Sequence, residues 1–299
     1  MNTMSQSDRV RIIAALVEGN SLRSVSRMTG IAINSVMRLL GQIGDVCAEY
    51  QDEHLRRLNL KRIECDEIWS FCYAKAKNVP EEMRGEKGVG DVWTWVAIDA
   101  ETKLIPCWLV GNRTPDSARV FIDDLAGRLL GTPQITTDGL KMYVRPIADS
   151  FGDMVDYAML IKIYGAPEPG TEARYSPSRI IGAEPQRISG DPDMSKVSTS
   201  YVERQNLSMR MGMRRFTRLT NGFSKKIENH VAAVALHYMH YNFARIHKTL
   251  RVTPAMAAGV SDHVWSLEEI VGLLEAKERQ AIEAGKMKRG AYRPRKNSN

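Results

Sequence analysis

Three acidic residues stand where a tertiary fold could bring their carboxylates together. Asp66 lies near the end of an apolar, aromatic run typical of a β-strand, and Asp138 closes a second such run. Glu203 belongs to an amphipathic segment with helical periodicity. Carboxylates are the ligands that Mg²⁺ prefers, and the ion keeps sites for water and phosphate oxygens. Two ions about 4 Å apart can activate the attacking oxygen and stabilise the leaving oxygen of an in-line displacement at phosphorus.

Each of these acids also has a purely structural interpretation. Asp66 could end a strand, Asp138 with Gly139 could form an Asp-Gly turn, and Glu203 could complete a capping box. Glu64 and Asp99 are competing acids, although Asp99 falls in an inferred hairpin turn, where Asp is favoured. The hypothesis of joint chemistry therefore depends on all three acids converging on one β-rich core.

The Glu203 segment is predicted to be a helix that docks on that core. Ser200 followed by Glu203 is a capping-box pattern, and Asn221-Gly222 is a plausible stop. The 3.6-residue periodicity predicts an apolar stripe formed by Val202, Met209, Met213 and Phe216. It also predicts a polar face formed by Glu203, Asn206, Arg210 and Arg214.

Positive charge is concentrated around this helix and at the end of the chain. The chain has a net charge of +7 and a pI near 9.2. Residues 201–251 contain ten Lys and Arg against two acids, and residues 286–299 contain six bases and no acid. The rest of the chain is therefore net negative. Such a concentrated basic region favours a polyanionic partner such as nucleic acid. The candidate phosphate contacts here are Asn206, Arg210, Arg214, Arg215, Arg218, Lys225 and Lys226.

Three short helices are predicted at the start, over residues 8–18, 22–28 and 33–43. Helix, glycine-containing turn and helix is the helix-turn-helix arrangement, which favours DNA binding. We expect Asn34, Ser35 and Arg38 to reach base edges. We expect Arg23 and Arg27 to contact phosphates. A helical bundle for dimerisation is the alternative interpretation.

The elements that must position the acids follow in a recognisable order. A polar connector over 51–60 precedes predicted strands at 62–71, 92–100 and 103–111. A helix opening at Thr114-Pro115 is expected to bury Val120, Phe121, Leu125, Leu129 and Leu130. A strand at 133–138, a helix at 141–150 and a strand at 154–165 come next. Residues 167–199 hold five of the twelve prolines and predict a long loop, either mobile or a functional flap. Helices are predicted at 224–247 and 265–284.

This order predicts an α/β (α+β) chain with four parts. These are a helix-turn-helix domain (1–50), a linker (51–60), a catalytic domain with a mixed sheet flanked by helices (61–260), and a C-terminal helix with a basic tail (261–299). At 299 residues and 43% hydrophobic, the chain can bury a substantial core.

Several classes of protein are disfavoured by the sequence. No run of eighteen apolar residues and no secretory signal is present, so neither membrane association nor export is expected, and a cytoplasmic location is. The four cysteines lack C-x-x-C spacing, which predicts reduced thiols. Four histidines lie on one predicted helix as two pairs, each seven residues apart, which is a poor spacing for a metal site. We therefore expect these histidines to be buried or to face DNA: His230, His237, His240 and His247.

The sequence resembles the DDE transposases of bacterial insertion sequences, specifically the insertion-sequence-one (InsB-like) group. The resemblance runs from about Arg62 to Ile270. It rests on the segments ECDEIWSF, ITTDG, STSYVERQNLSMRMGMRRFTRLTNGFSKK and HYNFARIHKTLRVTPAMAAGV. It implies an RNase H-like catalytic core in which Asp66, Asp138 and Glu203 are the metal ligands. It also implies that Arg210, seven residues after Glu203, contacts substrate DNA. The paired cysteines of the zinc-binding segment that often opens such chains do not occur here, so end recognition would rest on the helix-turn-helix and the basic regions.

The function implied is binding of terminal inverted repeats, metal-dependent strand cleavage and transfer of the 3′-OH into target DNA. Two Mg²⁺ ions, replaceable by Mn²⁺, are the expected cofactors. Double-stranded DNA is the expected partner, in a bacterial, nucleoid-associated setting, and joint processing of two ends favours a homodimer or larger homo-oligomer. The alternatives are a structure-selective nuclease of the same fold without strand transfer, and a catalytically idle DNA-binding regulator.

Overall fold

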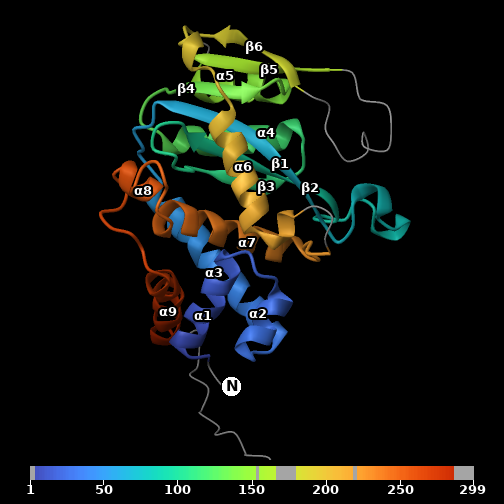
Figure 1. Ribbon diagram of the computed structural model, residues 1–299, viewed down its shortest axis with the longest axis vertical. Helices are drawn as coiled ribbons and strands as arrows, with labels where there is room; N and C mark the ends of the chain where they lie inside the picture. The colour runs from blue at the N-terminus through green and yellow to red at the C-terminus, as the bar shows by residue number, and fades with distance from the viewer. Residues whose placement is uncertain (1–3, 153–154, 166–179, 218–220, 286–299) are drawn as a thin grey trace, which may run out of the picture.

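The computed structural model describes residues 4–152, 155–165, 180–217 and 221–285. Three helices open the chain: α1 (Gln6–Val17), α2 (Leu22–Thr29) and α3 (Ile33–His54). Gly30 ends α2 in the left-handed conformation at φ 71°, which a glycine adopts without steric cost, and so makes the tight turn into α3. These helices and α9 (Leu267–Glu283) gather at one end of the molecule in Figure 1, while the last two strands lie at the other end.

The centre of the molecule is a six-stranded mixed sheet with strand order β3-β2-β1-β4-β5-β6. Its strands are β1 (Arg62–Cys72), β2 (Gly90–Asp99), β3 (Trp108–Gly111), β4 (Gln134–Asp138), β5 (Tyr157–Tyr164) and β6 (Ile180–Ser189). The pairs β1/β2, β2/β3 and β5/β6 are antiparallel, whereas β1/β4 and β4/β5 are parallel. The mixed sheet flanked by helices confirms the predicted α/β (α+β) class.

Different helices cover the two faces of β1. On one face, α4 (Pro115–Arg128) and α5 (Val144–Phe151) bury apolar residues against the sheet in one cluster with Ile63 and Cys65. On the other, α6 (Ser200–Gly212) and α7 (Ile227–Met239) form a second cluster with Ile68. In Figure 1, α6 crosses directly over β1. Because side chains alternate between faces along a strand, even-numbered residues of β1 face α6 and odd-numbered residues face α4.

Several predicted elements differ in extent from those observed. Helix α3 continues to His54, so the first residues of the predicted 51–60 connector are helical. Strand β3 begins only at Trp108, after Pro106, whose nitrogen cannot donate to the ladder. Val120 and Leu130 are 53% and 49% exposed, so the expectation that they face inward is wrong. The predicted helix over 224–247 is α7 followed by a π-helical turn, His240–Ala244.

The predicted long loop is partly a strand. Residues 180–189 form β6, which pairs with β5 at the edge of the sheet, while residues 166–179 lie outside the described part of the chain. The sequence of β6 does not predict a strand, because its residues are mostly exposed and of mixed polarity. An edge strand is held by backbone hydrogen bonds to its one neighbour and needs no buried apolar face. A short helix, α8 (Pro254–Ala257), precedes α9. The basic tail over 286–299 also lies outside the described residues.

Two expectations about composition can be compared with the structure directly. The four cysteines are free thiols, as predicted, and all four are buried. Among the described residues, no helix is both long and apolar enough to cross a membrane.

Helices α3 and α7 pack with almost no space between their backbones at Gly44. A methyl group placed on Gly44 would lie 2.4 Å from both Cα and Cβ of Ala232, far inside contact distance. By contrast, a methyl group on Gly41, one turn earlier in α3, would meet no atom within 4 Å. Gly44 therefore sets the approach of the N-terminal helices to the helix that backs the sheet.

We expect Gly44→Ala to lower the free energy of unfolding by about 1–3 kcal/mol, the usual cost of overpacking. Gly41→Ala is the matched control, and we expect it to be neutral or stabilising by up to about 1 kcal/mol, because Ala is the better helix former. Urea denaturation of the two variants and the wild type measures both effects. A Gly44→Ala protein as stable as Gly41→Ala would contradict the close approach of α3 and α7.

Candidate active site

The side chains of β1 that face α6 and α7 each contact one of these helices. The Glu64 carboxylate accepts hydrogen bonds from the backbone N–H groups of Tyr201 (2.8 Å) and Val202 (3.0 Å). These are N–H groups in the first turn of α6, which have no partner within the helix. A carboxylate at this position also interacts favourably with the helix dipole. Glu64 thus fixes the start of α6 on β1.

Asp66 lies two residues further along the same face. One carboxylate oxygen accepts a hydrogen bond from Asn206 Nδ2 of α6 (2.9 Å), and the other accepts the backbone N–H of Glu67 (2.8 Å). Asp138 is the last residue of β4, as predicted, and its Oδ1 accepts the backbone N–H of Leu140 (3.0 Å). Because β4 lies parallel to β1, its end brings Asp138 beside Asp66. Asp66 itself stands in the middle of an eleven-residue strand, not near its end as predicted.

The structure brings a third carboxylate to this pair, and it is Glu67. One carboxylate oxygen from each of Asp66, Glu67 and Asp138 lies within 4.8 Å of the others. Glu67 faces the α4 side, where the Tyr143 hydroxyl donates a hydrogen bond to it and Arg113 Nε lies 3.2 Å from its Oε2. Its side chain is 1% exposed. Burial raises the pKa of Glu67 to about 7, with Asp138 and Asp66 adding to the effect.

Sequence reasoning missed Glu67 because strand alternation places adjacent residues on opposite faces. The Asp-Glu pair itself was the available signal. Although Asp66 and Glu67 leave β1 on opposite faces, a carboxylate oxygen of each lies within 4.8 Å of Asp138 at the end of the neighbouring strand β4.

The cluster is electrostatically costly without a cation. Burial, with smaller contributions from Asp138 and Glu203, raises the pKa of Asp66 to about 6, although Lys162 opposes the shift. Asn206 Oδ1 is also buried and accepts no hydrogen bond from any residue that the structure describes. Closely spaced carboxylates beside an amide oxygen without a donor form a set of hard oxygen donors, the kind that Mg²⁺ or Mn²⁺ requires. The residues present therefore fit a divalent cation.

Glu203 lies on α6 beside this cluster but outside the set within 4.8 Å. Lys162 Nζ of β5 lies 2.6 Å from its Oε1, and the Thr199 hydroxyl donates a hydrogen bond to the same oxygen. The side chain of Glu203 is 40% exposed. Its charge contributes to the raised pKa of Asp66, so the two groups interact. Lys162 was not predicted, since a lone lysine on a strand carries no sequence signal.

The predicted start and end of this helix are corrected. Thr199, not Ser200, is the N-cap, and Glu64 replaces the predicted capping box by binding the first-turn N–H groups from across the sheet. The helix ends at Gly212, well before Asn221-Gly222, and Arg214–Phe216 form a separate 3₁₀ turn. Glu203, Asn206 and Arg210 thus share α6, whereas Arg214 does not.

The predicted DNA contacts fall in two regions. Around the turn between α2 and α3, Arg23, Arg27, Asn34 and Arg38 are exposed and Ser35 is half-buried. In the second region, around α6 and the start of α7, the positions differ widely. Arg214, Lys225 and Lys226 are exposed, and Arg210 is half-buried. Arg215 donates a hydrogen bond to Ser224 Oγ (2.7 Å), and burial lowers its pKa to about 10. Asn206 is buried on Asp66, and Arg218 lies outside the described residues.

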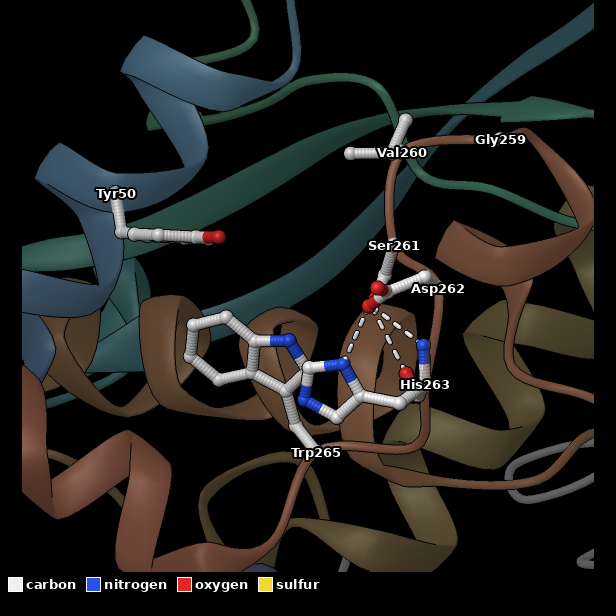
Figure 2. Close-up of a pocket in the computed structure, with 7 residues that line it drawn as sticks. All are labelled: Tyr50, Gly259, Val260, Ser261, Asp262, His263 and Trp265. Carbon is white, nitrogen blue, oxygen red and sulfur yellow. Dashed lines mark hydrogen bonds and ion pairs between the residues drawn. The ribbon is translucent and has the colours of Figure 1, made fainter.

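A hollow of about 530 Å³ lies away from the acids, between the end of α3 and the segment before α9. Figure 2 shows Trp265 and His263 with their rings one over the other and Tyr50 across the opening. His263 is already paired with Asp262 (2.6 Å) and Glu269 (2.8 Å). These carboxylates would repel a phosphate group, so the hollow is a poor candidate for a DNA-binding site.

No family model and no curated protein sequence matches this chain. Comparison with solved structures finds a piggyBac transposase in a synaptic complex with hairpin DNA, at a TM-score of 0.42 and 12% sequence identity. The match covers 96% of this chain and 76% of that one. The likeness is distant, and membership of the insertion-sequence-one group stays a prediction.

We expect Glu64→Ala to loosen the start of α6. Removing a helix cap typically costs about 0.5–2 kcal/mol of stability. Hydrogen exchange at the amides of Tyr201 and Val202 should therefore accelerate. Glu64→Gln is the matched control, because its side-chain carbonyl still accepts both hydrogen bonds and should retain most of the protection. Equal exchange rates in Glu64→Ala and wild type would contradict the anchoring role.

We expect Asp66→Asn to stabilise the metal-free protein at pH 7.5. The pKa of Asp66 is about 6 in the folded protein, against about 3.9 for an unperturbed Asp. The folded state therefore binds this proton more tightly, and the free energy of unfolding falls as pH rises from about 4 to about 6. The gain should be about 1–3 kcal/mol at pH 7.5 and should vanish near pH 4.

Thermal unfolding in EDTA at both pH values measures this effect. Asp191→Asn is the control, since its side chain is 92% exposed. An Asp66→Asn protein less stable than wild type at pH 7.5 would show that the Asp66 carboxylate is not under electrostatic strain.

Proposed function

We propose that this chain is a DNA transposase of the DDE type. The observation that carries the proposal is the convergence of Asp66, Glu67 and Asp138 within 4.8 Å on an RNase H-like sheet, with Glu203 and Asn206 of α6 beside them. Several buried carboxylates with raised pKa values are unfavourable for stability, and clusters of this kind are typical of sites that carry out chemistry. The basic surfaces beside the cluster support a polyanionic substrate.

Asp66, Asp138 and Glu203 would hold two Mg²⁺ ions, or Mn²⁺ in their place. When bound, such ions polarise the attacking water or 3′-OH and stabilise the leaving oxygen of a phosphodiester. The chain's own residues prepare this site. Glu64 fixes α6, and Asn206 holds the Asp66 carboxylate through one of its oxygens.

Lys162 balances the charge of Glu203 in the protein alone. The ion pair between Lys162 Nζ and Glu203 Oε1 keeps this carboxylate close to Asp66 while reducing repulsion between them. Arg210 on the same helix would bind phosphates of the DNA, together with the exposed Arg214, Lys225 and Lys226. Arg215 would reach a phosphate only after its hydrogen bond to Ser224 breaks.

The finer parts of the proposal follow from the sequence resemblance. The α2–α3 unit would bind terminal inverted repeats as a helix-turn-helix, with Asn34, Ser35 and Arg38 at base edges. Two ends of an insertion sequence would be processed by a homodimer or larger homo-oligomer. The protein would act in the bacterial cytoplasm on double-stranded DNA.

The test uses a labelled duplex that carries the element's end, a plasmid target, and Mg²⁺ or EDTA. We expect cleavage and joined product only with the metal ion. Asp138→Asn and Glu203→Gln should each lower the rate at least about 100-fold, more than the 10–100-fold typical of residues that only orient metal ligands. The exposed Asp191→Asn is the control and should retain the wild-type rate.

The other outcomes assign the alternatives. Metal-dependent cleavage without joining would favour a nuclease of the same fold. Specific binding of the DNA end with neither reaction would favour a regulator. Joining by Asp138→Asn at the wild-type rate would exclude the proposed use of the acids.

A further inference from the structure

An aromatic strip follows the face of β1 that carries Glu67. Along the odd-numbered positions, Trp69 and Phe71 come after Glu67, and Trp93 of β2 lies directly opposite Trp69. The rings of Trp69 and Phe71 are 5.8 Å apart, and Phe223 extends the strip at 4.9 Å from Phe71. All four rings are partly exposed.

The strip begins where the helices covering this face of the sheet end. Trp95, opposite Glu67 in the register, is fully buried against Phe121 of α4 and Tyr143. Two residues further along, at the next pair on the same face, Trp69 and Trp93 are partly exposed. Aromatic side chains that stay partly exposed on a sheet lose part of the stabilisation that full burial gives to the other large residues of this core. An exposed aromatic row therefore suggests a binding surface.

Cations lie along the same strip. Arg113 stands over the Trp93 ring at 4.7 Å and contacts Glu67 of the acidic cluster. Lys75 Nζ lies 5.8 Å from the Trp69 ring and 5.9 Å from the Phe71 ring. Lys225 Nζ lies 6.0 Å from the Phe223 ring. Lys75 and Lys225 are exposed. Flat apolar rings bordered by positive charge are complementary to nucleobases joined by phosphates.

We propose that Trp69, Phe71, Trp93 and Phe223 bind unpaired bases of a DNA strand that leads to the acidic cluster. Lys75, Arg113 and Lys225 would contact its phosphates. Stacking on aromatic rings tolerates any base, so the strip would accept an unpaired strand of any sequence. Arg113 joins the two sites, because it touches both the Trp93 ring and Glu67. The inference rests on the proposed function, since it names the form of DNA that the same site accepts.

Binding of an oligothymidine of about 12 nucleotides, within the range of known single-strand sites, tests the wild-type protein in EDTA. An abasic strand of the same length is the comparison, because it keeps the phosphates and lacks the bases. We expect the oligothymidine to bind at least tenfold more tightly and to quench tryptophan fluorescence. Equal affinities for the two strands would overturn the proposal, as would no binding of the oligothymidine.

Variants then locate the contact. We expect Trp69→Ala and Phe71→Ala each to weaken oligothymidine binding at least about fivefold, the lower end of the stacking contribution per base, with little change for the abasic strand. Trp265→Ala is the matched control. This tryptophan is also partly exposed and also packs against another ring, that of His263 (Figure 2). His263 is paired with the carboxylates of Asp262 and Glu269, so the surroundings of this ring are acidic. Equal losses in Trp265→Ala and Trp69→Ala would overturn the assignment to the strip.

The binding experiment and the activity test fail separately. Because binding is measured in EDTA, base-dependent binding without any metal-dependent cleavage would disprove the proposed reaction and leave the strip as a single-strand site. Cleavage that requires Asp138, together with equal affinity for thymidine and abasic strands, would disprove the strip and leave the reaction.

Discussion

The geometry of the site depends on one contact, between the Glu64 carboxylate and the first-turn N–H groups of α6. A helix start buried against a sheet leaves several donors without partners, and these must be satisfied from elsewhere. Here the partner is a strand residue more than a hundred positions earlier. Since Asp66 follows Glu64 by two residues on the same face of β1, the contact that fixes α6 also fixes the distance between α6 and Asp66. Asn206, two turns into α6, meets Asp66 as a consequence.

This arrangement accumulates negative charge that the protein alone only partly offsets. Glu64, Asp66 and Glu67 are consecutive or nearly so on β1, and burial raises the pKa of each. Each has a different compensation: N–H donors for Glu64, Asn206 and the Glu67 N–H for Asp66, and Tyr143 with Arg113 for Glu67. Each group is hydrogen-bonded, yet the oxygens of Asp66, Glu67 and Asp138 remain close together. A structure optimised for stability alone would not keep them so near one another.

The sequence was sufficient for the parts governed by local pattern. Alternation and turn chemistry located β1, β4 and the end of β4 at Asp138, and helical periodicity located α6. It was insufficient wherever a distant partner decides the outcome. Locally, Glu64 is only one more acid that competes with Asp66, because nothing in its own segment shows that it binds the start of α6. Lys162 and Glu67 were missed for the same reason, since their roles follow from the neighbours that β5 and β4 bring to them. The early end of α6 at Gly212 and the pairing of β6 with β5 likewise depend on packing and on backbone partners.

The two faces of β1 have different roles. Its even-numbered residues hold α6 and α7, from Glu64 through Asp66 to Ser70, whose hydroxyl lies 3.2 Å from His230. These contacts bury Glu64 and Ser70 on that face, while Asp66 stays partly exposed beside Asp138. The odd-numbered residues are covered only as far as Glu67, and beyond it the aromatic strip is partly open. Under the proposal above, an unpaired DNA strand would follow the odd-numbered face toward the acids. Glu67, whose side chain is 1% exposed, lies where the covered part of this face ends, and Arg113 links its carboxylate to the Trp93 ring at the start of the strip. An acid that alternation alone would exclude from the site thus connects the acidic cluster to the aromatic strip.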